Sequence, residues 1–150
     1  MTMPLYVLFR VGDASYVLPA DAVVVMESFT GATKVPGTPD HVAGLVQIRG
    51  GVIPVIDLRR RFGLPPAELT LDSRVVVTRI GERTVGLLAD SAREIVRLDP
   101  SAFRPPPEAV VEQSAKFVEA VAQLGDRLVL RIDERRVIGE EIEHGEERTL

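Results

Sequence analysis

The sequence predicts a mostly β protein, folded as a sandwich or barrel with a few short helices. Apolar residues recur in short runs, many of these runs alternate apolar with polar positions, and they are rich in β-branched side chains. In the second half, successive runs begin about ten residues apart from residue 74 to residue 98, a spacing typical of sandwiches and barrels. The chain has 150 residues, enough for one compact domain or for two small subdomains that share a core.

The N-terminal third predicts a hairpin and a further strand. In residues 5–11 the apolar positions 5, 7, 9 and 11 alternate with Tyr6, Leu8 and Arg10, which predicts a half-buried strand that ends at a Gly-Asp turn. Residues 16–18 supply its partner strand. A short irregular turn follows, then an extended segment over residues 23–26. Residues 31–39 contain two glycines and two prolines and predict a loop.

The most informative stretch is GLVQIRGGVIPVIDLRRRF, residues 44–62. Two β-branched runs flank a corner that contains Arg49, Gly50 and Gly51. Because glycine adopts positive φ without steric cost, Gly50 and Gly51 predict a tight hairpin between the runs. An arginine at such a corner is a candidate contact for a partner.

The end of this stretch predicts an edge strand and then a helix. Pro54 has no N–H to donate, which places its strand at a sheet edge or a bulge. Asp57 is a candidate N-cap for a helix of one or two turns that ends near Gly63.

The second half predicts further strands, an extended connector and a tail. Pro65-Pro66 marks a break, and no internal repeat is evident by eye. Proline-rich residues 104–108 predict a polyproline connector, a better interpretation than a ligand for an SH3 domain. Asp133 can cap the start of an acidic tail, residues 134–150, predicted to be a frayed helix or a disordered end. The predicted strands are 74–80, 84–89, 92–98, 117–122 and 128–132.

Composition excludes several classes of function. The chain is 45% hydrophobic and 27% charged, and its apolar runs are far shorter than the roughly 20 residues that span a bilayer. We therefore expect a soluble protein without membrane insertion, and no signal peptide is evident. Without cysteine, the chain has no disulfide and no thiolate metal site. The net charge of −4 argues against nucleic acid as a partner, and a cytoplasmic location fits.

A search for catalytic chemistry finds little. His41 sits in a predicted loop where a surface or capping role is favoured, and His144 lies among glutamates of the tail, at most a weak adventitious metal site. No phosphate loop and no GxSxG elbow occur. The basic run of residues 59–61 is interpreted as a solvated helix face. We predict no catalytic residue, no cofactor and no metal, and favour a binding module over an enzyme.

Several motifs together resemble the CheW-like domain family, adaptors of bacterial chemotaxis, over nearly the whole chain. Residues 44–50 and 53–59 resemble its G-x-x-x-x-R-G…P-x-x-D-L-R signature. Further matches are VGLLAD at 85–90, the proline connector after Phe103, and the hairpin at 124–128.

The resemblance implies two small five-stranded SH3-like β-barrels that share a hydrophobic interface, with short helices and no catalysis. It implies a role as adaptor between the cytoplasmic tip of chemoreceptors and a CheA-type histidine kinase, with contacts to other CheW-like domains left open. A regulatory domain of a larger kinase or coupling protein is an alternative within the family, and a small-ligand-binding or catalytic barrel is the alternative outside it.

The resemblance also implies site residues. Arg49 matches a functional arginine of the family, with Gly50 beside it, and Val23, Val25 and Met26 fall on its V-x-E-I segment near the receptor-facing groove. Val25 stands where the family usually has an acidic residue, and Glu27 is the nearest carboxylate, on the same strand face by alternation. For Arg49, a partner contact and a structural role at the corner are both open. For the three apolar residues, core packing is the competing interpretation.

The expected organisation is one domain over residues 1–150, with approximate subdomains at 13–75 and 76–133. Whether strand 5–11 is exchanged between the subdomains is left open, and residues 134–150 form the tail.

Overall fold

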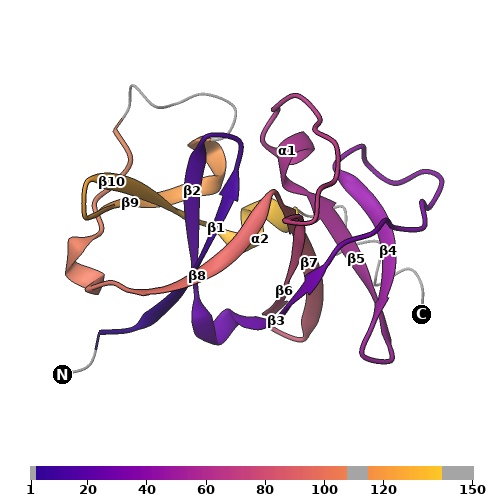
Figure 1. Cartoon of the computed structure of the whole chain (residues 1–150), viewed down its shortest axis with the longest axis horizontal. Helices are drawn as coiled ribbons and strands as arrows, with labels where there is room; N and C mark the ends of the chain where they lie inside the picture. Colours follow the sequence, from indigo (N-terminus) through magenta and orange to yellow (C-terminus); the bar gives the residue numbers. More distant parts are fainter. Residues whose placement is uncertain (1–2, 108–114, 140–150) are drawn as a thin grey trace.

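The chain folds into two five-stranded β-barrels that lie side by side, seen left and right in Figure 1. The computed structural model describes residues 3–107 and 115–139. Barrel A consists of β8 (Ser91–Arg97), β1 (Leu5–Val11), β2 (Ala14–Pro19), β10 (Arg127–Ile132) and β9 (Val118–Leu124), in spatial order. Barrel B consists of β3 (Val23–Ser28), β6 (Arg74–Ile80), β7 (Arg83–Ala89), β5 (Gly51–Asp57) and β4 (Val42–Ile48).

This strand pairing divides the chain differently from the expected subdomains. A boundary between residues 75 and 76 falls inside β6, which pairs with β3 and β7 of barrel B along its length. Barrel A instead takes β1 and β2 from the N-terminus and its other three strands from the C-terminal part. The chain changes barrel at the 3₁₀ helix Ala20–Ala22 and again at Asp90. Not one strand but the whole β1–β2 hairpin therefore belongs with the C-terminal strands.

The structure shows an internal repeat that the sequence did not reveal by eye. The order of two hairpin strands, three further strands and a helix occurs twice, in residues 5–61 and 74–138. Each barrel combines the first hairpin of one repeat with the last three strands of the other, through the parallel pairs β2–β10 and β5–β7. Residues 7–21 align without a gap to residues 76–90, and both segments have Gly after their first strand and end in Ala-Asp. Since each barrel needs strands from both repeats, the two barrels fold as one unit.

Both barrels close in the same way, by a segment that continues an edge strand and bridges to the opposite edge. After β3, Thr33 exchanges backbone hydrogen bonds of 2.9 and 2.8 Å with Leu45 of β4. After β8, Arg104 exchanges two bonds of 2.8 Å with Val121 of β9. The predicted proline connector thus starts with a residue that pairs with a strand edge.

Each repeat ends in a short helix with an aspartate cap. In α1 (Leu58–Arg61), Asp57 accepts hydrogen bonds from the Arg59 and Arg60 N–H groups, as predicted. Asp133 caps α2 (Glu134–Ile138) by accepting from the Arg136 N–H.

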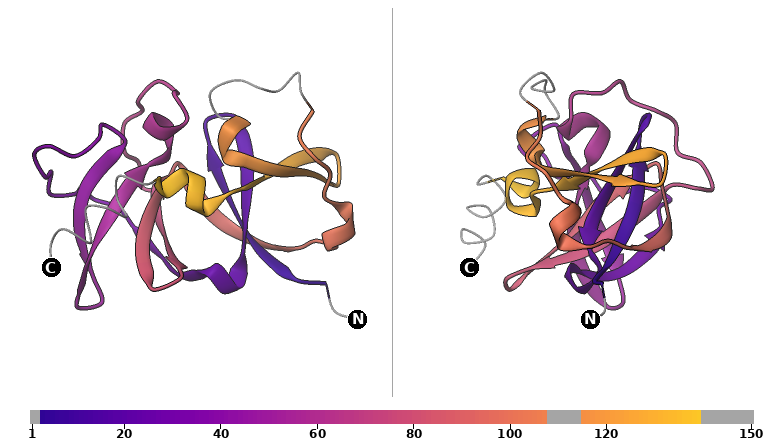
Figure 2. Two further views of the ribbon diagram at one scale, coloured as in Figure 1. Left: turned by 180° about the vertical axis from the view of Figure 1, so that it is seen from behind. Right: turned by 90° about the vertical axis from the view of Figure 1, so that its left-hand side faces the viewer.

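The predicted tail therefore begins as an ordered helix. Val137 and Ile138 of α2 are almost fully buried, so apolar packing holds this turn in place. His144 and the rest of the tail from residue 140 lie outside the described residues. Figure 2 shows α2 lying between the two barrels.

The prediction that Pro54 marks a sheet edge or bulge was wrong. Strand β5 lies inside barrel B, between β7 and β4. Its pairing with β7 begins only at Val55, and Leu45, opposite Pro54, directs its own N–H and C=O to Thr33. Leu45 and Pro54 are consequently a non-hydrogen-bonded pair of the antiparallel ladder. The missing N–H of Pro54 therefore costs no hydrogen bond to β4, and proline is tolerated inside the sheet.

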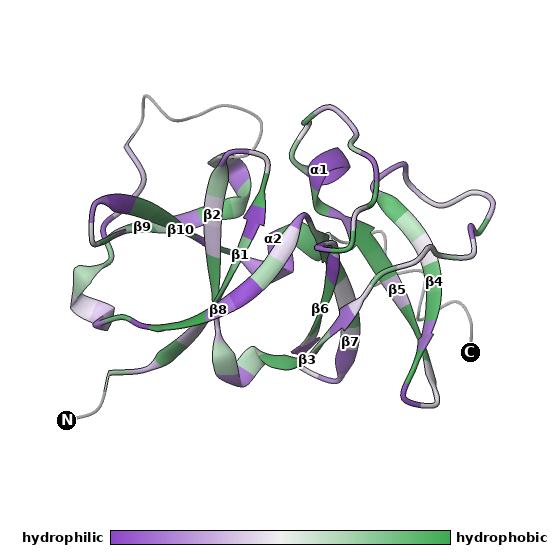
Figure 3. Cartoon of the chain, in the orientation of Figure 1, coloured by the Kyte–Doolittle hydropathy of each residue, from purple (hydrophilic) through white to green (hydrophobic). Residues whose placement is uncertain are grey.

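A single apolar core joins the barrels, and Figure 3 shows the hydrophobic residues along their strands. It includes a chain of aromatic rings, in which Phe62 at the end of α1 lies 5.1 Å from Tyr16 and 5.5 Å from Phe117. Tyr16 and Phe117 belong to the barrel A side, whereas α1 follows β5 of barrel B. Phe62 therefore packs the end of α1 against barrel A. Each barrel also has a smaller cluster of its own. Within residues 3–107 and 115–139, no helix has the length and apolarity to cross a membrane.

Candidate functional site

The candidate site is the tip of the β4–β5 hairpin in barrel B and the neighbouring edge strand β3. Ile48 pairs with Gly51, which leaves Arg49 and Gly50 as a two-residue loop. Both have positive φ, 52° and 80°, as a type I′ hairpin turn requires. The predicted hairpin is confirmed, but its loop is one residue earlier than Gly50-Gly51, and Gly51 is part of β5.

Arg49 is the one residue other than glycine with positive φ among residues 3–107 and 115–139. A left-handed conformation costs an L-residue about 1 kcal/mol or more, a cost that glycine does not bear. The Arg49 side chain is 68% exposed, and its Nε lies 3.8 Å from Glu27 Oε1, whose side chain is 40% exposed. An exposed pair at that distance contributes little to stability. The local geometry thus gives Arg49 no structural task that glycine would not perform as well.

The Arg49–Glu27 pair spans the opening between the two edge strands of barrel B. Glu27 is near the end of β3, and Arg49 follows the end of β4. Beside the pair lies a surface depression of about 430 Å³, lined by residues 28–33, residues 45–48 and Val75. Arg49, Gly50 and Glu27 are therefore brought together at one exposed rim.

The three apolar candidates on β3 do not share one face. The pairing of β3 with β6 shifts in register between Val23 and Val25, which marks a bulge at Val24. Val23 and Met26 pack against the core shared by the barrels, whereas Val25 packs against the inner cluster of barrel B. All three are half-buried. Val24 is the apolar side chain that the bulge turns outward, 53% exposed, and sequence alternation gave no signal for it.

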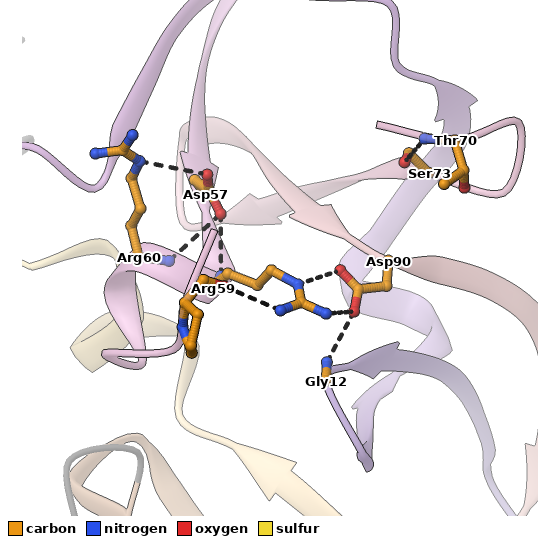
Figure 4. A network of polar contacts seen from close by, with 8 residues as sticks. Gly12, Asp57, Arg59, Arg60, Thr70, Ser73 and Asp90 are labelled. Carbon is orange, nitrogen blue, oxygen red and sulfur yellow. Dashed lines mark hydrogen bonds and ion pairs between the residues drawn. The ribbon is translucent and has the colours of Figure 1, made fainter. Parts of the chain in front are cut away.

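The run of arginines in α1 is not the solvated helix face that the sequence indicated. Arg59 makes a bidentate pair with Asp90, with its Nε 2.8 Å from Oδ1 and its Nη2 2.7 Å from Oδ2 (Figure 4). Arg61 donates to the Val137 and Arg136 carbonyls of α2 and lies over the Phe117 ring. Only Arg60 stays on the surface, next to Asp57. Two of the three cations thus hold the barrels together.

The Asp90 carboxylate is held in its charged form. Partial burial acts to raise its pKa, but the hydrogen bonds from Arg59 and from the Gly12 N–H act against burial and leave the pKa below its usual value. Burial also raises the pKa of Glu134 in α2, where Glu119 and Asp133 add repulsion.

The structure gives His41 a structural place. Its carbonyl accepts the Asp57 N–H at 2.8 Å, and its Nδ1 lies 3.4 Å from Arg61 Nη1. Among residues 3–107 and 115–139, no group of three His, Asp or Glu side chains is arranged to hold a metal ion.

Comparison with known proteins gives one consistent result. The chain matches the CheW-like domain over residues 5–141. It is 30% identical to the chemotaxis protein CheW of Bacillus subtilis, over 90% of this chain and 86% of that protein. It is also 30% identical to the protein FrzA of Myxococcus xanthus, over 75% of this chain and 72% of that protein.

A solved structure agrees. The scaffolding protein TtCheW from Thermoanaerobacter tengcongensis superposes with a TM-score of 0.84 at 29% identity, covering 93% of this chain and 90% of that one. Fold, signature and relatives point the same way, and the predicted two SH3-like barrels are confirmed. The chain belongs to the CheW-like domain family, the non-catalytic adaptors of chemotaxis-type signalling.

Proposed function

We propose that this chain couples the cytoplasmic tip of a chemoreceptor to a CheA-type histidine kinase in the cytoplasm, and that the rim formed by Glu27, Arg49 and Gly50 makes one of these contacts. The observation that carries the proposal is the conformation of Arg49. A strained, exposed arginine at a position where glycine is at ease is best explained by what its side chain binds outside the chain.

The chemistry of the rim suits a helix end or a polar helix face of a partner. The guanidinium offers five N–H donors to carboxylates or backbone carbonyls, and the loose distance to Glu27 leaves most of them available. Glu27 accepts hydrogen bonds from cationic or amide groups beside the same contact. Val23, Val25 and Met26 contribute by holding β3 in place from within the protein, since each packs against a core cluster.

The rim is one of two faces that an adaptor needs. Contacts of the ordinary size bury roughly 800 Å² on each partner, and their individual affinities are often modest. An adaptor that holds two partners makes the second contact effectively intramolecular, which strengthens the assembly without new contacts. Other CheW-like domains are candidate partners at the same faces.

Substitution of Arg49 by alanine tests the proposal. We expect its affinity for one partner, either the CheW-like domain of the kinase or a receptor-tip fragment, to fall at least tenfold in isothermal titration calorimetry, the loss typical of a buried charged contact. Arg60→Ala is the matched control, because Arg60 is also an exposed arginine with one loose carboxylate neighbour, Asp57 at 3.7 Å. Unchanged affinity of Arg49→Ala for both partners would refute the role of the rim.

Val25 needs a different test from a glutamate substitution. Its side chain is half-buried against the inner cluster of barrel B, so a glutamate there would partly bury a charge and destabilise the strand as well as change any contact. Val24→Glu places the carboxylate on the exposed side of the same strand. A change in receptor affinity for this variant, with the melting temperature unchanged, supports β3 as part of the contact.

A further inference from the structure

Three segments of the chain meet at the carboxylate of Asp90 (Figure 4). Arg59 holds both of its oxygens, and Oδ2 also accepts the backbone N–H of Gly12 at 2.8 Å. The Asp90 N–H donates to the Arg10 carbonyl at 2.9 Å, and Arg59 Nη1 donates to the Pro65 carbonyl at 3.0 Å. We call Arg59, Asp90 and Gly12 the clamp.

The clamp joins the two barrels. Arg59 lies in α1, which follows β5 of barrel B, and Gly12 lies in the β1–β2 turn of barrel A. Asp90 is the residue at which the chain passes from β7 in barrel B to β8 in barrel A. The side chains of Arg59 and Asp90 are only 23% and 33% exposed, so solvent screens this pair less than a fully exposed one.

The clamp contributes what the shared apolar core does not. Apolar burial holds the barrels together but is largely non-directional. A bidentate guanidinium–carboxylate pair is directional, because two parallel bonds fix the planes of both groups. The core therefore gives cohesion between the barrels, and the clamp fixes their relative orientation.

The internal repeat supplies a comparison within the same molecule. The positions that correspond to Gly12, Arg59 and Asp90 in the other repeat are Gly81, Arg135 and Asp21, so the residue types are the same. In the described part of the chain, however, no hydrogen bond or ion pair joins Arg135 to Asp21. Of the two equivalent sets of residues, only Arg59, Asp90 and Gly12 thus form a clamp, while Arg61 adds hydrogen bonds from α1 to the Val137 and Arg136 carbonyls of α2.

We propose that Arg59 and Asp90 are positioning residues that set the angle between the two barrels and so the spacing of the partner contacts. The effect on coupling rests on the proposed adaptor function, whereas the effect on orientation does not. Without the clamp, each barrel keeps its own surface, but the two contacts are no longer held at a fixed spacing.

The experiment measures orientation and coupling separately. The natural chain has no cysteine, so spin labels can be placed at the cysteine substitutions Val52→Cys and Leu128→Cys. These two positions are equivalent in the two barrels and are exposed, at 65% and 62%. Distances between the labels are measured by pulsed electron resonance in Arg59→Lys, which keeps the charge but loses the fork. Arg135→Lys, the same change at the corresponding position, is the control, and Asp90→Asn is the second variant.

We expect the distance distribution to broaden or shift in Arg59→Lys and Asp90→Asn, and to remain unchanged in Arg135→Lys. Affinities for the kinase domain alone and the receptor fragment alone should stay within about twofold, while the affinity with which the chain bridges the two falls about tenfold as the linked contact is lost. An unchanged distribution in folded Arg59→Lys and Asp90→Asn would overturn the proposal, whatever the partners do. A changed distribution with unchanged bridging would overturn the link to coupling. Failure of the unsubstituted protein to bind either partner would instead refute the proposed function.

Discussion

Replacement of Arg49 by glycine separates a contact role from a structural one, because a contact role predicts almost no change in stability and a structural role predicts a clear loss. Glycine removes the cost of φ 52°, about 1 kcal/mol for an L-residue. Glycine also gives the unfolded chain more conformational entropy, which lowers the free energy of unfolding by about 0.5–1 kcal/mol. Loss of the exposed Glu27 pair, at 3.8 Å, costs a few tenths of a kcal/mol at most. The net change in unfolding free energy is therefore within about 1 kcal/mol of zero.

For a chain of this size, a change of 1 kcal/mol shifts the melting temperature by about 2–4 °C. Calorimetric melting of Arg49→Gly should consequently fall within that range of the natural protein. Arg49→Ala keeps the strain and loses the pair, so it should melt at or below Arg49→Gly. A glycine variant that melts below the alanine variant, or a fall of more than about 6 °C in both, would refute the reasoning and make Arg49 a structural residue.

Three further predictions concern stability. Gly44→Ala should lower the unfolding free energy by about 3 kcal/mol or more, because a Cβ at φ 141° would lie 2.2 Å from a backbone oxygen of the barrel-closing segment. Gly51→Ala is the control and should change the unfolding free energy by less than about 1 kcal/mol, because no neighbouring atom would lie nearer than 3.6 Å to its Cβ. Equal effects of the two variants in urea titrations would contradict this prediction. The folded state lowers the pKa of Asp90 below its ordinary value of 3.8, so ionised Asp90 stabilises the fold at any pH above 3.8. This stabilisation is lost as the pH falls from 3.8 through the folded pKa. Asp90→Asn should therefore flatten the acid side of the stability curve, and an unaltered curve counts against the clamp. The raised pKa of Glu134 is a penalty at neutral pH that is relieved as the pH falls towards 4.5. Glu134→Gln should raise the melting temperature at pH 7, by an amount that shrinks near pH 4.5, and a gain independent of pH would contradict this origin.

The sequence predicts local structure well where one physical rule dominates. The strand over residues 5–11, the aspartate caps and the strands on either side of Arg49 follow from propensity and capping, and the structure confirms them. The prediction that strand 5–11 is half-buried was wrong, because Tyr6 and Leu8 pack in the inner cluster of barrel A while Phe9 and Val11 pack in the shared core. The Arg49-Gly50 loop differs by one residue because the register of β4 with β5 decides which pair closes the hairpin, and register depends on packing.

Long-range pairing is what the sequence did not predict. The exchange of hairpins between the repeats depends on the parallel pairs β2–β10 and β5–β7, which join residues far apart in the chain. The arginines of α1 looked solvated because their partners, Asp90 and the carbonyls of α2, are also distant in sequence. The alignment of residues 7–21 with 76–90 was the available signal for the repeat.

The candidate site was predicted in part. The sequence and its family resemblance selected Arg49, Gly50 and Glu27, and these lie together at the rim of barrel B. The bulge at Val24 separates Val25 from its neighbours Val23 and Met26, and a single bulge leaves no mark in a run of valines. Val25, where the family resemblance implies an acidic residue, therefore packs against the inner cluster of barrel B.

Reconstitution of a receptor-tip fragment, a CheA-type kinase and this chain tests the central claim most directly. The measurement is the amount of kinase that sediments with receptor-bearing vesicles as the chain is added. Coupling predicts that the kinase sediments only when the chain is present, and that Arg49→Ala reduces the sedimented kinase while Arg60→Ala does not. Kinase recovery that is the same with and without the chain would contradict the account.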